Sequence, residues 1–112
     1  MNIAIDVETW GLEATAKAFI LGTIAYEKKK TEVYYNRNKM WKRIIELGEK
    51  EQQRNHCLNV YEHGDYDFYT IADLTDPTIT YHSFSPMIIN KEKTNFIDTT
   101  TIIKKPLKEK VS

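Results

Sequence analysis

The sequence has almost no cysteine, no apolar stretch of membrane-spanning length and no net charge. Its single cysteine, Cys57, excludes an internal disulfide and a cysteine-based zinc site. No apolar run approaches the roughly 18 residues that a helix needs to cross a bilayer, and the first residues do not have the pattern of a signal peptide. We therefore expect a cytoplasmic protein with no membrane partner.

The formal net charge is zero, with 16 basic and 16 acidic residues, which argues against a protein that holds nucleic acid by positive charge alone. The charges are unevenly distributed. Residues 56–83 contain five acids and neither lysine nor arginine, whereas residues 36–55 and 84–112 each contain six bases and three acids. This distribution is compatible with a cation site between phosphate-attracting surfaces, and equally with an ordinary solvated surface.

A chain of 112 residues fits one domain, 1–112, and its hydrophobic periodicity predicts a mixture of strands and helices. Strands are expected at 2–8, 18–27, 31–35, 56–61, 79–84, 87–90 and 95–103, and helices from Asn36 or Asn38 to about Arg54 and over 65–74. The polar turn 28–30 joins the second and third strands into a hairpin. The fourth strand is reached through a helix, so it can run parallel to an earlier strand. The pattern predicts an α/β fold with a mixed sheet flanked by helices.

Asp6 and Glu8 close the first expected strand. Residues two apart on a strand point to the same face, about 6–7 Å apart along it, so the two carboxylates project together. Hard cations such as Mg²⁺ and Mn²⁺ prefer such oxygen ligands. The alternative is a pair of acids on an ordinary solvated face; the position of the pair at the end of an apolar strand favours a metal site.

The segment His63–Phe68 follows the fourth expected strand. If strands 2–8 and 56–61 are parallel neighbours, with the hairpin on the far side of the first, the strand order reverses between them. Ligands of open α/β sheets bind at such a switch point, near the carboxyl ends of the strands. Asp67, at the start of a short helix, would then reach the metal held by Asp6 and Glu8. The alternative is that Asp67 only balances the helix dipole.

Two of these segments resemble motifs of a known family. Ile5–Leu12, Ile-Asp-Val-Glu-Thr-Trp-Gly-Leu, resembles the first motif of the DEDD 3′–5′ exonucleases, Asp-x-Glu-Thr-x-Gly-Leu, and His63–Phe68 is similar to their second motif. The tail, with Asn95–Thr99 and Pro106–Glu109, looks most like the proofreading domains of family B DNA polymerases, notably the protein-primed kind. The resemblance implies a ribonuclease H-like fold and two-metal hydrolysis of single-stranded DNA or RNA with Mg²⁺ or Mn²⁺.

The resemblance also assigns roles to residues. It implies that Asp6, Glu8 and Asp67 are the catalytic, metal-binding carboxylates, and that Thr9, Leu12 and Tyr66 bind the substrate. The Asn of the second motif is missing, and the third motif has no counterpart. We therefore expect an exonuclease domain that is shortened at its C-terminal end and hydrolyses poorly alone. A second copy of the chain or a completing polypeptide is the expected partner. The alternative is a non-catalytic nucleic-acid-binding or interaction module with the same fold.

Other residues carry weaker signals. Asp98 lies in an expected strand and matches a non-catalytic position of the family, so we do not expect it to be the fourth carboxylate. Tyr26, Tyr34, Tyr35 and Tyr61 follow strand patterns and are expected to pack against the sheet. Trp41 is expected in the core.

Overall fold

The computed structural model describes residues 1–11, 16–63, 66–72, 79–80, 87–89 and 94–99. The expected site residue Leu12 lies outside the described residues, as do the ends of the expected strand 79–84 and of the expected helix 65–74. In the described part, no helix is long and apolar enough to cross a membrane.

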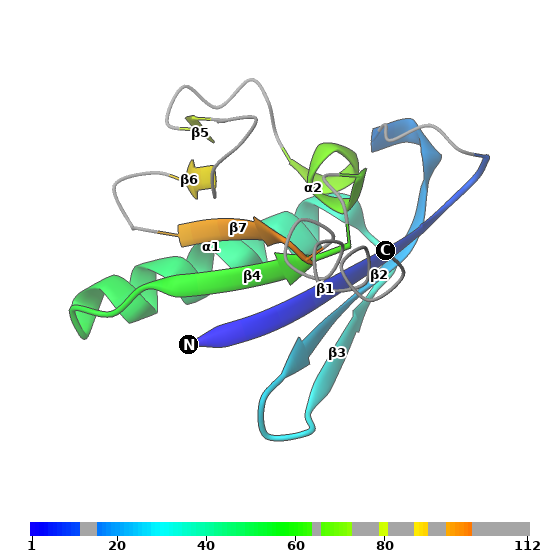
Figure 1. Ribbon diagram of the computed structural model, residues 1–112. Coiled ribbons are helices and arrows are strands. Elements are labelled where there is room, and N and C mark those ends of the chain that lie inside the picture. Colours follow the sequence, from blue (N-terminus) through cyan, green and yellow to red (C-terminus); the bar gives the residue numbers. More distant parts are fainter. Residues whose placement is uncertain (12–15, 64–65, 73–78, 81–86, 90–93, 100–112) are drawn as a thin grey trace, which may run out of the picture.

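The described elements are mostly strands, interrupted by one 3₁₀ turn and two α-helices (Figure 1). They are β1 (Asn2–Thr9), the 3₁₀ turn η1 (Ala16–Ala18), β2 (Phe19–Tyr26), β3 (Thr31–Tyr34), α1 (Arg37–Gln53), β4 (Leu58–Glu62), α2 (Tyr66–Ile71), β5 (Ile79–Thr80), β6 (Met87–Ile89) and β7 (Thr94–Asp98). The expected α/β class is confirmed.

The strands form one mixed sheet in the order β3-β2-β1-β4-β7-β6-β5. β1 is antiparallel to β2, which is antiparallel to β3, so the expected hairpin is confirmed. On its other side β1 is parallel to β4, and β4 is parallel to β7. The strand order therefore reverses between β1 and β4, as the sequence predicted.

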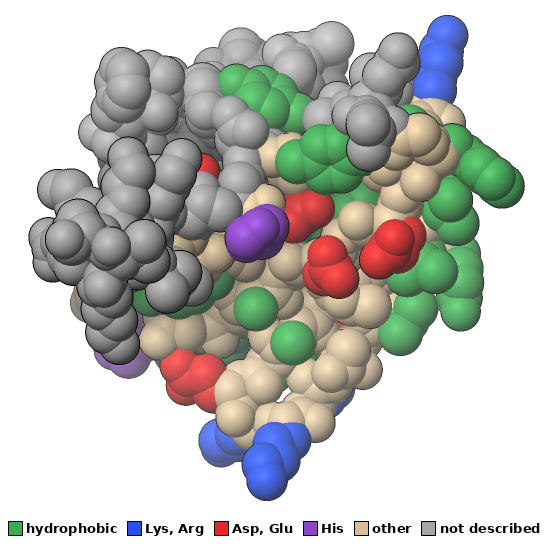
Figure 2. All heavy atoms as spheres, turned by 45° about the vertical axis from the view of Figure 1, so that its right-hand side comes forward, with side chains coloured by type: hydrophobic (Ala, Val, Ile, Leu, Met, Phe, Trp, Pro, Cys, Tyr) green, Lys and Arg blue, Asp and Glu red, His purple; other side chains and the backbone are tan. Residues whose placement is uncertain are grey.

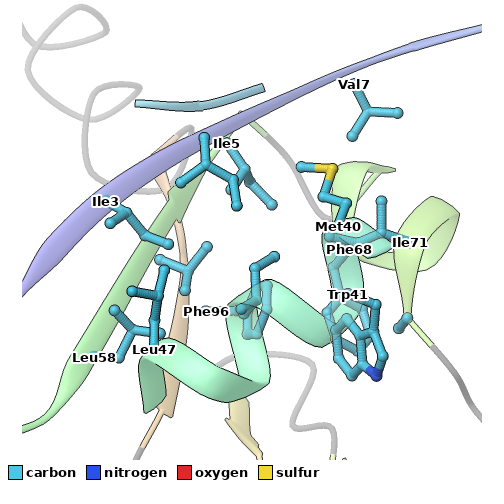
Figure 3. Packing of buried hydrophobic residues seen from close by; sticks show 14 residues of the cluster. Ile3, Ile5, Val7, Met40, Trp41, Leu47, Leu58, Phe68, Ile71 and Phe96 are labelled. Carbon is cyan, nitrogen blue, oxygen red and sulfur yellow. The ribbon is translucent and has the colours of Figure 1, made fainter. Parts of the chain in front are cut away.

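Helix α1 covers one face of this sheet. The side chain of Asn36 accepts a hydrogen bond from the backbone N–H of Lys39 at 3.0 Å, which makes Asn36 the N-cap. The buried side of the helix carries Met40, Trp41, Ile44 and Leu47. Ile3, Ile5 and Val7 of β1 point toward the same core (Figure 3). The prediction that Trp41 belongs to the core is confirmed.

Most strand boundaries differ from the prediction by one or two residues. β4 begins at Leu58 instead of His56, because Asn55 adopts a left-handed φ of 58° and the His56 N–H donates to the carbonyl of Glu51, closing the end of α1. β2 begins at Phe19 because Ala18 belongs to η1. β7 ends at Asp98, and residues 100–103 of the expected strand 95–103 lie outside the described residues.

The face of β1 opposite α1 carries polar side chains. At one end of this face a row of side-chain hydrogen bonds crosses three strands and ends at Glu27, the residue after β2. The amide of Asn95 donates to Asn59 (3.2 Å), Asn59 donates to Asn2 (2.9 Å), and Asn2 donates to the carboxylate of Glu27 (2.8 Å). Asp6 and Glu8 lie on the same face toward the carboxyl end of β1. This face of β1 thus carries Asn2, Asp6 and Glu8, with the small Ala4 between the first two.

Candidate functional site

The candidate site lies at the carboxyl ends of β1 and β4, where the strand order reverses. β2 flanks β1 on one side and β4 flanks it on the other, which is the arrangement that favours ligand binding in open α/β sheets. Figure 2 brings this end of the sheet forward and shows acidic side chains gathered beside a histidine in the middle of the face.

Asp6 and Glu8 share the exposed face of β1. Both side chains are exposed, and Val7 between them is buried in the core. The alternation follows from the period of two along a strand, so the prediction that the two carboxylates project together is confirmed. Asp6 pairs with Thr23 of β2 in the sheet and Glu8 pairs with Leu21.

Asp67 lies in the first turn of α2 and is 5% exposed. The pKa of its carboxyl is raised to about 6, mainly by burial and also by the negative charge of Asp6, while backbone hydrogen bonds from Val7 and His63 and the nearby charge of His63 act in the opposite direction. Asp67 thus contacts the backbone of β1 beside Asp6, although 61 positions separate the two in the sequence. The structure brings together the two segments that the sequence singled out.

Aromatic packing fixes the position of α2, and with it the position of Asp67. The ring of Phe68, which is buried, makes edge contacts with Phe96 at 5.0 Å and with Trp41 at 6.0 Å between centroids. At the other end of α2, Nη1 of Arg37 donates to the carbonyls of Ile71 (2.8 Å) and Ala72 (3.3 Å). Asp67 is therefore held by a helix that is packed at both ends.

Thr9 and Tyr66 also meet at this site. Their side-chain hydroxyls are hydrogen-bonded to each other, and the Thr9 hydroxyl contacts the carbonyl of Gly11 at 3.3 Å. Gly11 has a φ of +67°, which favours glycine because it has no Cβ. The Trp10 N–H donates to the carbonyl of Ala18 at 2.8 Å and ties this turn to the start of β2.

Two further carboxylates lie at the same end of the sheet, at the carboxyl ends of β4 and β7. Glu62, the last residue of β4, is buried, and it pairs in the sheet with Asp98, the last residue of β7. The Thr99 hydroxyl donates to the Glu62 carbonyl at 2.9 Å. Glu62 was not among the site residues expected from the sequence. An acid at an inward-facing strand position after Leu58 and Val60 would have indicated a functional carboxylate. Asp98 lies on a strand, as predicted.

The donors at this site are carboxylate oxygens, the ligand type that suits Mg²⁺ and Mn²⁺. A cation beside Asp6 and Asp67 would reduce the repulsion that contributes to the raised pKa of Asp67. Within the described ranges, no three Asp, Glu, His or Cys side chains already form a group that holds one ion. The donor chemistry of Asp6, Glu8 and Asp67 therefore fits a divalent cation.

Comparison of the chain with protein-family models, curated proteins and solved structures gave no significant match. The geometry of this site and the motifs in the sequence are therefore the basis for assigning a function.

Proposed function

We propose that this chain is a metal-dependent 3′–5′ exonuclease domain of the DEDD type, with a ribonuclease H-like fold, that acts on single-stranded nucleic acid. One observation carries the proposal. Asp6 and Glu8 on β1 and Asp67 on α2, which match the family's first two motifs in sequence, lie at one end of the sheet, and Asp67 contacts β1 beside Asp6.

The topology supports the same proposal. The resemblance implies a hairpin beyond β1 and a parallel strand on its other side, and the sheet has this order. In the proposed reaction Asp6, Glu8 and Asp67 hold Mg²⁺ or Mn²⁺. When bound, these ions activate a water molecule and stabilise the leaving oxygen of the phosphodiester. Thr9 and Tyr66, whose hydroxyls are hydrogen-bonded, shape the adjacent surface that receives the 3′-terminal nucleotide.

A digestion experiment tests this function. A single-stranded oligonucleotide labelled at its 5′ end is incubated with the chain and Mn²⁺, and we expect a ladder of products shortened stepwise from the 3′ end. Asp6→Ala should abolish the ladder because it removes a metal ligand. Glu49→Ala, which changes an exposed carboxylate on α1, is the matched control and should digest like the parent.

The expected rate is low, because the family's third motif has no counterpart in this sequence and a misplacement of about 1 Å in such a site costs around 10²-fold. Digestion that persists in Asp6→Ala would contradict the proposal. Binding of the oligonucleotide without any digestion, in both Mg²⁺ and Mn²⁺, would favour the non-catalytic nucleic-acid-binding module instead.

A further inference from the structure

We infer that Trp10, Val33 and Tyr35 form a surface on which the bases of a single-stranded nucleic acid stack, beside Asp6 and Glu8. The inference rests on the proposed function. It adds where the nucleotides that precede the 3′-terminal nucleotide bind. These three residues are called the stacking surface.

The stacking surface is marked by unusual exposure of large apolar side chains. Tyr35 is 77% exposed, Trp10 74% and Val33 50%. The prediction that Tyr35 packs against the sheet is therefore wrong, because it follows the end of β3, which is an edge strand of the sheet formed by the described residues. Single exposed apolar side chains are common, but a group beside a polar site indicates a binding surface.

The sheet register places Val33 of the stacking surface on the same face as the acidic pair. Val33 pairs with Thr23, and Thr23 pairs with Asp6, so Val33 and Asp6 lie in one row, two strand spacings or about 10 Å apart. The alternate residues of β3, Glu32 and Tyr34, turn to the other face, where Glu32 contacts Arg43 of α1.

Tyr35 is exposed directly after β3, and Trp10 is exposed directly after β1, beyond the register shift between Glu8 and Thr9. In Figure 2 hydrophobic side chains border the acidic ones on this face. Flat exposed rings therefore lie next to the carboxylates that carry the proposed chemistry.

The charges along the hairpin fit a polynucleotide. Lys28 and Lys29 are exposed at the turn between β2 and β3, at the opposite end of the hairpin from the stacking surface, whereas the neighbouring Lys30 pairs with Glu32 at 3.8 Å. A single strand that lies along β3 would place phosphates near these lysines and bases on the rings, and its end would reach Asp6 and Glu8. Aromatic rings stack on every base, so such a surface is tolerant of sequence.

Fluorescence anisotropy without divalent metal tests the inference. The probes are a labelled oligothymidylate and an abasic deoxyribose-phosphate oligomer of equal length, so that only one of them offers bases. Trp10→Ala and Tyr35→Ala should each weaken oligothymidylate binding about 5-fold to 100-fold, and leave the abasic oligomer unchanged. Tyr35→Phe keeps the ring and should bind like the parent. Lys28→Gln with Lys29→Gln should weaken both probes and reduce the salt dependence.

Equal oligothymidylate affinity of the parent, Trp10→Ala and Tyr35→Ala would overturn the inference, as would equal binding of the two probes by the parent or no binding at low salt. The altered side chains are exposed, so each variant should fold like the parent, and a circular dichroism spectrum of each variant serves as the control. Because binding is measured without metal, a failure of digestion does not affect this result. Conversely, digestion by the parent with unchanged binding in the variants would reject the stacking surface and leave the proposed function standing.

Discussion

The hydroxyl of Thr9, at the end of β1, is hydrogen-bonded to the hydroxyl of Tyr66, the first residue of α2, across 57 positions of sequence. This bond joins the two segments that resemble exonuclease motifs. It also connects the strand that carries Asp6 and Glu8 to the helix that carries Asp67, so the relative position of the carboxylates depends on it in part.

Removing either hydroxyl should destabilise the fold and loosen the site. We expect Thr9→Val and Tyr66→Phe each to lower the free energy of unfolding by about 1 kcal/mol. The double variant should lose less than the sum of the two, because both remove the same bond. Urea denaturation of the four proteins measures the coupling energy. A coupling near zero would show that the bond contributes nothing to stability.

The raised pKa of Asp67 predicts a pH-dependent stability. In the folded state the pKa of the Asp67 carboxyl is about 6, compared with an ordinary value of 3.8. Between pH 3.8 and about pH 6 the folded state therefore binds more protons at this group than the unfolded state does. Stability from this group is therefore greatest below about pH 4 and falls as the pH rises to about 6. The ionised carboxylate then costs on the order of 3 kcal/mol, from the rule of 1.36 kcal/mol per pKa unit.

Asp67→Asn should remove that cost. We expect the variant to be more stable than the parent at pH 8 by about 1–3 kcal/mol, with a smaller difference at pH 4. Urea denaturation at the two pH values measures both differences. Glu49→Gln, at an exposed position on α1, is the control and should follow the parent. An Asp67→Asn protein with the same pH dependence as the parent would contradict this account of the buried carboxyl.

Divalent cations should bind at Asp6, Glu8 and Asp67. Titration calorimetry at neutral pH should detect Mn²⁺ binding by the parent. Asp6→Ala should weaken it by at least about tenfold, since even changes to groups that only support a metal ligand cost 10- to 100-fold. Glu49→Ala should bind Mn²⁺ like the parent. If the Asp6→Ala and parent proteins bind Mn²⁺ equally, the ion is held elsewhere.

The attachment of the hairpin to α1 depends on Glu32. Its carboxylate accepts hydrogen bonds from the hydroxyls of Tyr26 (2.7 Å) and Tyr34 (2.8 Å) and contacts Arg43. Burial alone would raise the pKa of Glu32, but the hydrogen bonds from Tyr26, Tyr34 and Arg43 lower it below its ordinary value. Burial, together with the hydrogen bond to the negative Glu32 carboxylate, raises the pKa of both tyrosines to about 12, while the charge of Arg43 acts in the opposite direction.

Since the folded-state pKa of Glu32 is lowered, its contribution to stability is present above the ordinary value of 4.5 and is lost as the pH falls below it. Glu32→Gln should therefore cost about 1–2 kcal/mol at pH 7 and less at pH 3, by urea denaturation. Glu46→Gln changes an exposed acid that also contacts Arg43 and should cost less. An equal loss for Glu32→Gln at both pH values would show that the ionised carboxylate is not responsible.

Most strands and helices of the described part could be predicted from the sequence, because their signals are local. The alternation of Ile3, Ile5 and Val7 with polar residues defines β1, and the helical spacing after Asn36 defines α1. The same local rule places Asp6 and Glu8 on one face. The start of β4 could not be predicted, because the His56 N–H donates a hydrogen bond to the carbonyl of Glu51 and His56 therefore belongs to the C-terminal cap of α1.

The juxtaposition of residues far apart in the sequence depends on the folded chain. Asp67 lies beside Asp6 because β4 pairs in parallel with β1 and because Phe68 packs against Trp41 and Phe96. The burial that raises the pKa of Asp67 comes from the same packing, and no spacing in the sequence encodes it. The exposure of Tyr35 follows in the same way from the position of β3 at the sheet edge. Periodicity thus sets which face a side chain takes, whereas strand order and core packing set which side chains meet.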